Sequence, residues 1–268
     1  MLLLDSHHIS AFLMDMDGIL YHGSKVLPGA INFLAAVSHF PVIFITNNPI
    51  RSAEEVVGNL RQMGFENIQT RQIVTSAMVT AEWLQQQKKA FRYFAVGAGA
   101  LHHYLQQAGG IADEDNADFV VVGEGAGLDY SSLTTGINLI KKQGATLLVT
   151  NPDSCVDSYS QGQHQLLPGG GALAASFEQA SGQKALVMGK PEPRLFQMAL
   201  ERLNVPVNQC LMIGDRPDTD ILGAQQAGIC TALVRSGQFL SGQAWPEYID
   251  KPDFDCNSLN ELQLKLKL

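Results

Sequence analysis

The strongest constraint on the fold is the alternation of short apolar runs with helical patterns along the chain. The runs are apolar almost throughout, which is typical of parallel strands covered by helices on both faces. Strands that alternate with helices in this way predict an α/β fold with a doubly wound parallel sheet. The predicted strands occupy residues 9–14, 42–45, 120–122, 147–149, 186–188, 211–213 and 232–234.

Helical patterns fill the intervals between these runs. Pro28 can open one helix, Ser52 and Glu55 have the spacing of a capping box, and Pro193 can open another helix. Each pattern carries one apolar stripe that a sheet can cover. The stripes are Ile31, Leu34 and Ala35, then Val56, Leu60 and Met63, then Phe196, Ala199, Leu200 and Leu203.

The chain length of 268 residues fits two domains better than one. The motifs that carry chemistry fall before about residue 50 and after about residue 187. More than a hundred residues with strand and helix patterns of their own lie between them. We therefore predict a core domain formed by residues 1–76 and 187–268, with residues 77–186 inserted as a second α/β domain.

Composition excludes several classes of partner. The formal net charge is −8 and no run of Lys or Arg occurs, which argues against nucleic-acid binding. No apolar stretch approaches the length of a membrane span, and the first residues do not form a signal peptide. The four cysteines are far apart, which argues against a disulfide framework or a zinc site. We expect a cytoplasmic protein without nucleic-acid or membrane partners.

Asp15 and Asp17 follow the first predicted strand and run into Gly18. Two carboxylates so close repel each other unless a cation neutralises them. Magnesium takes a few carboxylates together with phosphate oxygens, so this pair indicates a metal site. The alternative reading is an ordinary Asp-x-Asp-Gly turn at the surface.

Three further groups follow predicted strands. Thr46 and Asn47 follow the second, Lys190 follows residues 186–188, and Asp215 follows residues 211–213. Each has an ordinary interpretation as a turn, a solvated lysine or a helix cap. Because ligands bind at the carboxyl edge of an open parallel sheet, we expect these groups to converge.

The combination is more specific than its parts. Asp15-x-Asp17-Gly18, a Thr at 46, Lys190 and a Gly-Asp at 214–215 resemble the four motifs of the haloacid dehalogenase superfamily of phosphatases. Further matches at residues 46–48, 150–153, 189–191 and 215–221 make the sequence similar to the NagD-like and 4-nitrophenylphosphatase branch. This resemblance implies a Rossmann-like core with a large α/β cap between the second and third motifs.

The resemblance implies a Mg²⁺-dependent hydrolysis of a phosphate monoester through an aspartyl phosphate. Asp15 would be the nucleophile, and Asp17 would act first as general acid and then as general base. Asp15, the backbone carbonyl of Asp17 and the side chain of Asp215 would hold the Mg²⁺. Supporting positions would be Gly18, Gly214 and Asp220, the last for the metal waters or for the orientation of Lys190.

The remaining implied roles concern the substrate. Thr46, Asn47 and Lys190 would bind the oxygens of the transferring phosphoryl group. Asn151 and Asp153 match a cap motif of this branch and would contact the substrate. The expected partner is a small phosphorylated metabolite, such as a sugar phosphate or a nucleoside monophosphate. The resemblance also allows a homo-oligomer that forms through the cap.

Three alternatives stay open at this point. A phosphoryl-transferring relative, such as a mutase, shares the same motifs. A signalling module that carries phosphate on Asp15 also uses Asp, Thr and Lys at strand ends, but such modules are much shorter. A dinucleotide-binding oxidoreductase is disfavoured, because the glycine clusters at residues 97–99 and 123–125 both lack the third glycine of the fingerprint.

Overall fold

The computed structural model describes residues 9–160 and 163–268, and the chain divides into two compact units. The first unit contains the described residues up to 46, residues 55–74 and residues 190–268. The second contains residues 47–54 and 75–189. Residues 47–54 therefore belong to the second unit, although they lie between two segments of the first. The predicted limits of the insert, 77 and 186, stay a prediction.

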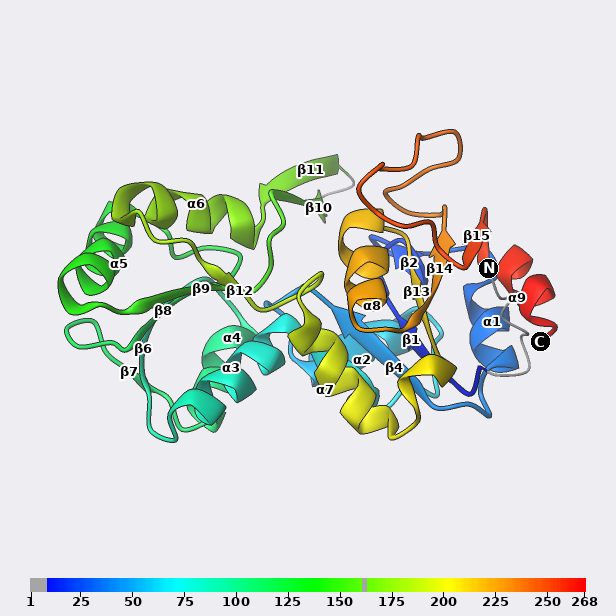
Figure 1. The fold of residues 1–268 in the computed structure, drawn as a ribbon, viewed down its shortest axis with the longest axis horizontal. Coiled ribbons are helices and arrows are strands. Elements are labelled where there is room, and N and C mark those ends of the chain that lie inside the picture. Colours follow the sequence, from blue (N-terminus) through cyan, green and yellow to red (C-terminus); the bar gives the residue numbers. More distant parts are fainter. Residues whose placement is uncertain (1–8, 161–162) are drawn as a thin grey trace. The chain divides into compact units, whose positions relative to one another are not determined.

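The first unit is built on a six-stranded sheet (Figure 1). Its strands are β1 (Ala11–Met14), β4 (Val42–Thr46), β5 (Ile73–Thr75), β13 (Cys210–Gly214), β14 (Cys230–Val234) and β15 (Phe254–Cys256). They lie in the order β15-β14-β13-β1-β4-β5. β1 pairs in parallel with β13 and β4, and β14 pairs in parallel with β13 and β15. Four of the predicted strands, at residues 9–14, 42–45, 211–213 and 232–234, correspond to the centre of this sheet.

The helices that belong wholly or mostly to this unit are α1 (Ala30–Ala36), α2 (Ala53–Gln62), α7 (Pro193–Leu203), α8 (Leu222–Gln226) and α9 (Leu259–Leu266). α7 packs on β4 and against α8, whereas α9 packs against α1 and β14. Pro193 is the first residue of α7, as predicted, and the helix buries Phe196, Ala199 and Leu203. Smaller elements are the antiparallel pair β2 (Tyr21–His22) and β3 (Lys25–Val26), the 3₁₀ turns η2 (Thr70–Gln72) and η3 (Val207–Gln209), and the π-helical turn η4 (Pro217–Ile221).

The second unit has its own parallel sheet and an antiparallel hairpin. The sheet contains β6 (Arg92–Val96), β7 (Ile111–Ala112), β8 (Phe119–Val122), β9 (Thr146–Val149) and β12 (Leu186–Val187), in the order β12-β9-β8-β6-β7. Its helices are α3 (Ser76–Gln87), α4 (Ala100–Gln107), α5 (Tyr130–Gln143) and α6 (Gly170–Ser181). The hairpin consists of β10 (Cys155–Ser160) and β11 (Gln163–Pro168).

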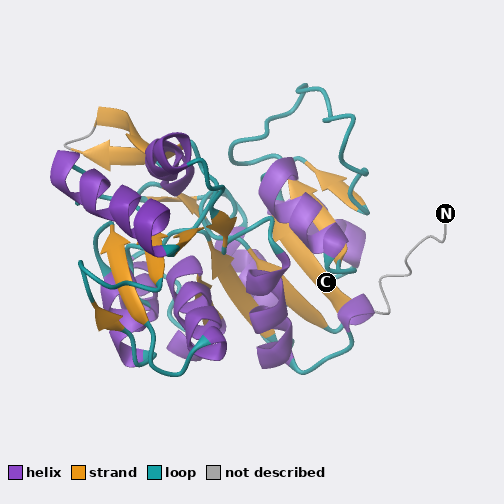
Figure 2. Ribbon diagram, turned by 60° about the vertical axis from the view of Figure 1, so that its left-hand side comes forward, coloured by secondary structure: helices purple, strands orange, loops and turns teal. Residues whose placement is uncertain are grey.

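Both faces of the second sheet are covered by helices, which explains why its central strands β8 and β9 are almost entirely apolar. Val120, Val122, Leu147 and Val149 join a buried cluster with residues of α5 and α6. The intervening Val121 and Leu148 join another cluster with residues of α3 and α4. Figure 2 shows the helices on the two sides of the strands. The doubly wound α/β fold predicted from the sequence is confirmed.

One predicted strand lies in a different sheet from the one expected. Residues 186–188 were expected to end beside the other motif strands, but β12 pairs with β9 at the edge of the second sheet. Lys190 begins the final segment of the first unit just beyond it. An apolar run this short does not indicate which strand it will pair with. Among the described residues, no helix is both long enough and apolar enough to cross a membrane.

The packing of the second unit makes a prediction about stability. Phe177 of α6 is fully buried in the cluster that covers one face of the sheet. Phe177→Ala should lower the free energy of unfolding by about 3–5 kcal/mol, because it leaves a cavity under the helix. Urea denaturation measures the loss. Gln179→Ala, at an exposed position of the same helix, is the control and should change the free energy by less than about 0.5 kcal/mol.

Candidate active site

Two aspartates meet because their strands are neighbours in register. Met14 of β1 lies beside Ile213 of β13, and the backbone N–H of Asp15 donates to the Ile213 carbonyl at 2.9 Å. Asp15 follows β1 and Asp215 follows β13 at the same carboxyl edge of the sheet. The expected convergence of these motif residues therefore follows from parallel pairing.

A third carboxylate comes from the turn that follows β13. Asp220 lies in η4, and one oxygen each of Asp15, Asp215 and Asp220 lies within 4.8 Å of the others. Gly214 makes this approach possible, because a Cβ at residue 214 would overlap the Asp220 side chain. This close contact explains why a glycine precedes the aspartate in the Gly-Asp motif.

Lys190 forms hydrogen bonds to two of these carboxylates. Its Nζ donates to Asp15 Oδ1 and to Asp220 Oδ1, both at 2.6 Å. Asp220 Oδ2 accepts the Arg216 N–H at 3.1 Å, so both oxygens of Asp220 are engaged. Asp220 thus accepts from both the Lys190 side chain and the Arg216 backbone, and its supporting role stays a prediction.

The charges of this cluster do not balance. Lys190, Asp215 and Asp220 are each at most 3% exposed, and Asp15 is 9% exposed. Three ionised carboxylates and one ammonium would leave two buried negative charges, which a divalent cation offsets. Among the described residues, Asp215 Oδ1 accepts no hydrogen bond and is therefore available to such a cation. The donor set therefore fits a hard divalent cation such as Mg²⁺.

The electrostatics of the cluster reflect this imbalance. Burial raises the pKa of Asp15 to about 7, although the ammonium of Lys190 works in the opposite direction. Burial and the neighbouring Asp220 and Asp15 raise the pKa of Asp215 well above its usual value. Burial lowers the pKa of Lys190, but the adjacent Asp15 and Asp220 outweigh it, so the net shift is upward and the lysine stays charged.

A loop after β14 encloses the Asp215 carboxylate, and the sequence analysis did not anticipate it. The Gln238 N–H donates to Asp215 Oδ2 at 2.6 Å, and Ser236 Oγ donates to the Gly18 carbonyl at 2.7 Å. Gly18 has a φ of +82°, and a Cβ at Gly18 or Gly237 would overlap the Asp215 carboxylate. The only sequence signal was the position of this loop after a parallel strand.

Two other predicted site residues of the first unit, Asp17 and Thr46, are more exposed to solvent. The side chain of Asp17 is 59% exposed, and the His22 imidazole Nδ1 lies 3.6 Å from its Oδ1. The negative charge of Asp17 also raises the pKa of Asp15, but less than burial and Asp220 do. Thr46 is the last residue of β4 and is half-buried.

The other predicted residues gather in a buried polar cluster of the second unit. Asn47 Nδ2 donates to Asp153 Oδ2 at 3.2 Å, and Asn151 Nδ2 donates to the Asn47 carbonyl at 3.0 Å. The Asp153 N–H donates to Asn151 Oδ1 at 3.1 Å. The structure therefore brings Asn47 together with Asn151 and Asp153, which lie more than a hundred residues further along the chain.

Glu124 completes this cluster and was missed by the sequence analysis, which considered residues 123–125 only as a glycine cluster. Val122 and Val149 are paired in β8 and β9, so Glu124 and Asn151 lie level, each two residues beyond. Asn151 Nδ2 donates to Glu124 Oε1 at 2.7 Å. Burial raises the pKa of Glu124 to about 7, with a further rise from Asp153. A charged residue just after an apolar parallel strand was the available signal.

Comparisons with known proteins agree with this geometry. A family model for haloacid dehalogenase-like hydrolases matches residues 12–111, and a second, HAD-hydrolase-like model matches residues 187–262. The chain is 37% identical to a dihydroxyacetone phosphatase of Corynebacterium glutamicum, over 85% of this chain and 81% of that protein. It is 31% identical to an acid sugar phosphatase of Staphylococcus haemolyticus, over 93% of both chains.

Solved structures give the same result. A 4-nitrophenylphosphatase from Thermotoga maritima has a TM-score of 0.85 and 32% identity, with 98% of both chains covered. NagD from E. coli K-12 has a TM-score of 0.82 and 30% identity, covering 94% of this chain and 98% of that one. Both relatives match nearly the full length of the chain, so the similarity includes both units.

The burial of Glu124 predicts a pH-dependent stability. Its folded-state pKa of about 7 lies above the usual 4.5, so the folded protein binds this proton more tightly than the unfolded chain. The stabilisation is complete below pH 4.5 and is lost as the pH rises through 7. Between pH 4.5 and 8, the wild type should lose up to about 3 kcal/mol relative to Glu124→Gln, which cannot titrate.

Urea denaturation of both proteins at several pH values checks this difference. Glu114→Gln, at an exposed position of the same unit, is the control and should follow the wild-type pH profile. A stability difference between wild type and Glu124→Gln that does not change with pH would contradict the prediction.

Proposed function

Because this chain belongs to the haloacid dehalogenase-like hydrolases, and within them to the NagD and p-nitrophenylphosphatase type, we propose that it hydrolyses small sugar phosphates with Mg²⁺ through a phosphorylated Asp15. The chain is a phosphatase, as its named relatives are. The metal, the covalent intermediate and the substrate class are the parts that we propose.

One observation carries the proposal. The ammonium of Lys190 lies between Asp15 Oδ1 and Asp220 Oδ1, while an oxygen of Asp215 lies within 4.8 Å of oxygens of both aspartates. Lys190 thereby holds Asp15 through Oδ1, and we propose that Oδ2 is the attacking oxygen. A carboxylate fixed in this way is suited to in-line attack on phosphorus.

In the first half-reaction, Asp15 Oδ2 forms a bond to phosphorus as the bond from phosphorus to the substrate oxygen breaks. The leaving oxygen takes a proton from the carboxyl group of Asp17. Lys190 offsets negative charge on the phosphoryl oxygens, and Thr46 and Asn47 donate hydrogen bonds to them. These roles of Asp17, Thr46 and Asn47 rest on the family's motifs.

In the second half-reaction, the Asp17 carboxylate takes a proton from a water molecule, whose oxygen attacks phosphorus. The bond to Asp15 breaks, inorganic phosphate leaves, and both carboxyl groups return to their starting states. Asp15, Asp215 and the Asp17 carbonyl would hold the Mg²⁺. When bound, this ion supplies the positive charge that lets an anionic carboxylate approach an anionic phosphate.

The substrate class follows from the relatives. Two of them are named dihydroxyacetone phosphatase and acid sugar phosphatase, which supports a sugar phosphate as the substrate that we propose for the chain. We propose that Asn151 and Asp153 of the second unit contact the organic part of the substrate. A panel of phosphate monoesters, ranked by kcat/KM, tests this choice. A preference for nucleoside monophosphates over all sugar phosphates would contradict it.

A phosphotransferase or mutase would share every residue described above. Hydrolysis in ¹⁸O-labelled water distinguishes the two, because only hydrolysis places the label in the released phosphate. A signalling module would instead accumulate phosphate on Asp15 without turnover. We expect labelled inorganic phosphate and repeated turnover.

Replacing the nucleophile tests the covalent mechanism. Asp15→Asn should lower kcat by about 10⁴-fold or more, because an amide cannot attack phosphorus. Phosphate release and acid-quench trapping of phosphoprotein measure the two consequences. Asp250→Asn, an exposed position of the same unit, should retain the wild-type rate. Substantial turnover by a folded Asp15→Asn protein would remove Asp15 from the reaction.

Metal removal tests the acidic cluster. Exhaustive chelation should abolish phosphate release, because the buried carboxylates then lack their counter-ion, and added Mg²⁺ should restore it. Asp215→Asn should need a higher Mg²⁺ concentration for half-maximal activity than the wild type. Turnover that survives chelation would argue against a metal-dependent reaction.

A further inference from the structure

The loop at residues 236–240 determines where the Asp215 carboxylate points. The Gln238 N–H donates directly to Asp215 Oδ2, and Ser236 ties the loop to Gly18. Gly237 lies so close to Asp215 that a side chain would not fit there. The donor to Asp215 is a backbone group, so its position depends on whatever holds the loop in place.

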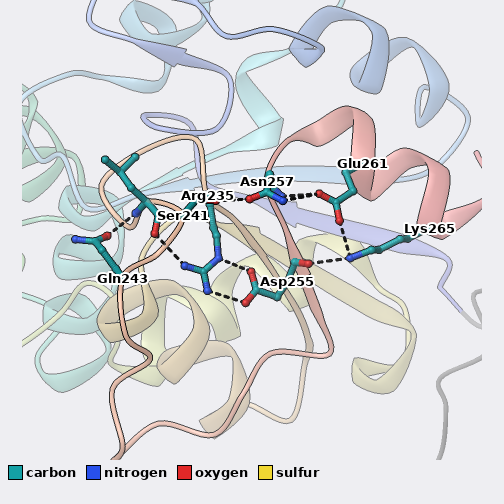
Figure 3. A network of polar contacts seen from close by, with 8 residues as sticks. Arg235, Ser241, Gln243, Asp255, Asn257, Glu261 and Lys265 are labelled. Atoms are coloured by element: carbon teal, nitrogen blue, oxygen red, sulfur yellow. Dashed lines mark hydrogen bonds and ion pairs between the residues drawn. The ribbon is translucent and has the colours of Figure 1, made fainter.

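Arg235, the residue after β14, holds both ends of this loop. Its Nε and Nη2 donate to the two oxygens of Asp255 at 2.7 and 2.8 Å, and its Nη1 donates to the Leu240 carbonyl at 3.0 Å (Figure 3). Its guanidinium carbon lies 4.8 Å from the centre of the Phe239 ring. One side chain thus connects strand β15 to the loop's far end.

The contacts of Arg235 require the shape of a guanidinium. A planar fork can bind both oxygens of a carboxylate, donate to a third acceptor and stack on a ring at the same time. A lysine ammonium carries the same charge but cannot satisfy this geometry. Only 14% of the Arg235 side chain is exposed, so the pair with Asp255 is better shielded than an ordinary surface ion pair.

We infer that Arg235 is a positioning residue for the Mg²⁺ site, which it serves by fixing the loop that orients Asp215. The inference rests on the metal site of the proposed function. Partners that orient a metal ligand without touching the metal affect its affinity, commonly by 10- to 100-fold. Arg235 acts on Asp215 only through the loop, so we expect a change in Mg²⁺ affinity near the lower end of that range.

Arg235→Met tests the inference, because it keeps an apolar stem and removes the guanidinium. Isothermal titration calorimetry of the full chain with Mg²⁺ should show a Kd about tenfold higher than that of the wild type. At saturating Mg²⁺, kcat should return to within twofold of the wild-type value. A residue with a purely structural role would lower the unfolding temperature and leave the Kd for Mg²⁺ unchanged.

Lys265→Met is the matched control. Lys265 donates to the Asp255 carbonyl at 2.8 Å and pairs with Glu261, but it does not touch the loop. Its Kd for Mg²⁺ should equal that of the wild type. If Arg235→Met does not fold, Arg235→Lys replaces it and should give an intermediate Kd.

The outcomes separate the two proposals. Wild-type Mg²⁺ binding with an unchanged Kd in the Arg235 variants overturns the inference alone. An equal rise in Kd in Lys265→Met also overturns it, since the effect would then be a general loss of stability. Absence of saturable Mg²⁺ binding by the wild type would overturn the metal site of the proposed function, and this inference with it.

Discussion

The arrangement of the first unit's polar site depends on one buried ammonium group. Lys190 lies between Asp15 and Asp220, which come from opposite ends of the chain, and none of the three is well exposed to water. Without the lysine, the carboxylates would repel one another in a medium that screens charge poorly. With it, the site keeps a residual negative charge and Asp15 is fixed through one of its oxygens. Attraction for a dication and readiness for nucleophilic attack therefore have the same origin.

Both polar clusters are built by the same rule. In each unit, parallel strands end at one edge, and the residues just beyond the last paired positions lie close to each other. In the first unit this brings Asp15 and Asp215 together, and in the second it brings Glu124 and Asn151 together. A buried carboxyl group with a raised pKa occurs in both clusters, Asp15 in the first and Glu124 in the second, and burial is the main cause of both shifts.

The sequence alone was sufficient for the α/β class and for the central strands, because an apolar run covered on both faces is distinctive. It was not sufficient for the pairing of β12 or for strands such as β6 and β15, whose polar residues interrupt the pattern. Asp15, Lys190 and Asp215 could be found because their residue types and order carry chemistry. Glu124 and Arg235 were missed, because the contacts that single them out are with side chains 20 or more residues away in the sequence.

Residues 47–54 belong to the second unit although they interrupt the first. They are held there by bonds from Asn151 to the Asn47 carbonyl, from Ser76 Oγ to the same oxygen, and from the Ala100 N–H to the Ile50 carbonyl. The second unit therefore does not consist of one continuous segment, and it cannot be removed by cutting the chain at only two junctions. A chimera that gives this core the second unit of a relative would have to exchange two separate stretches of sequence together.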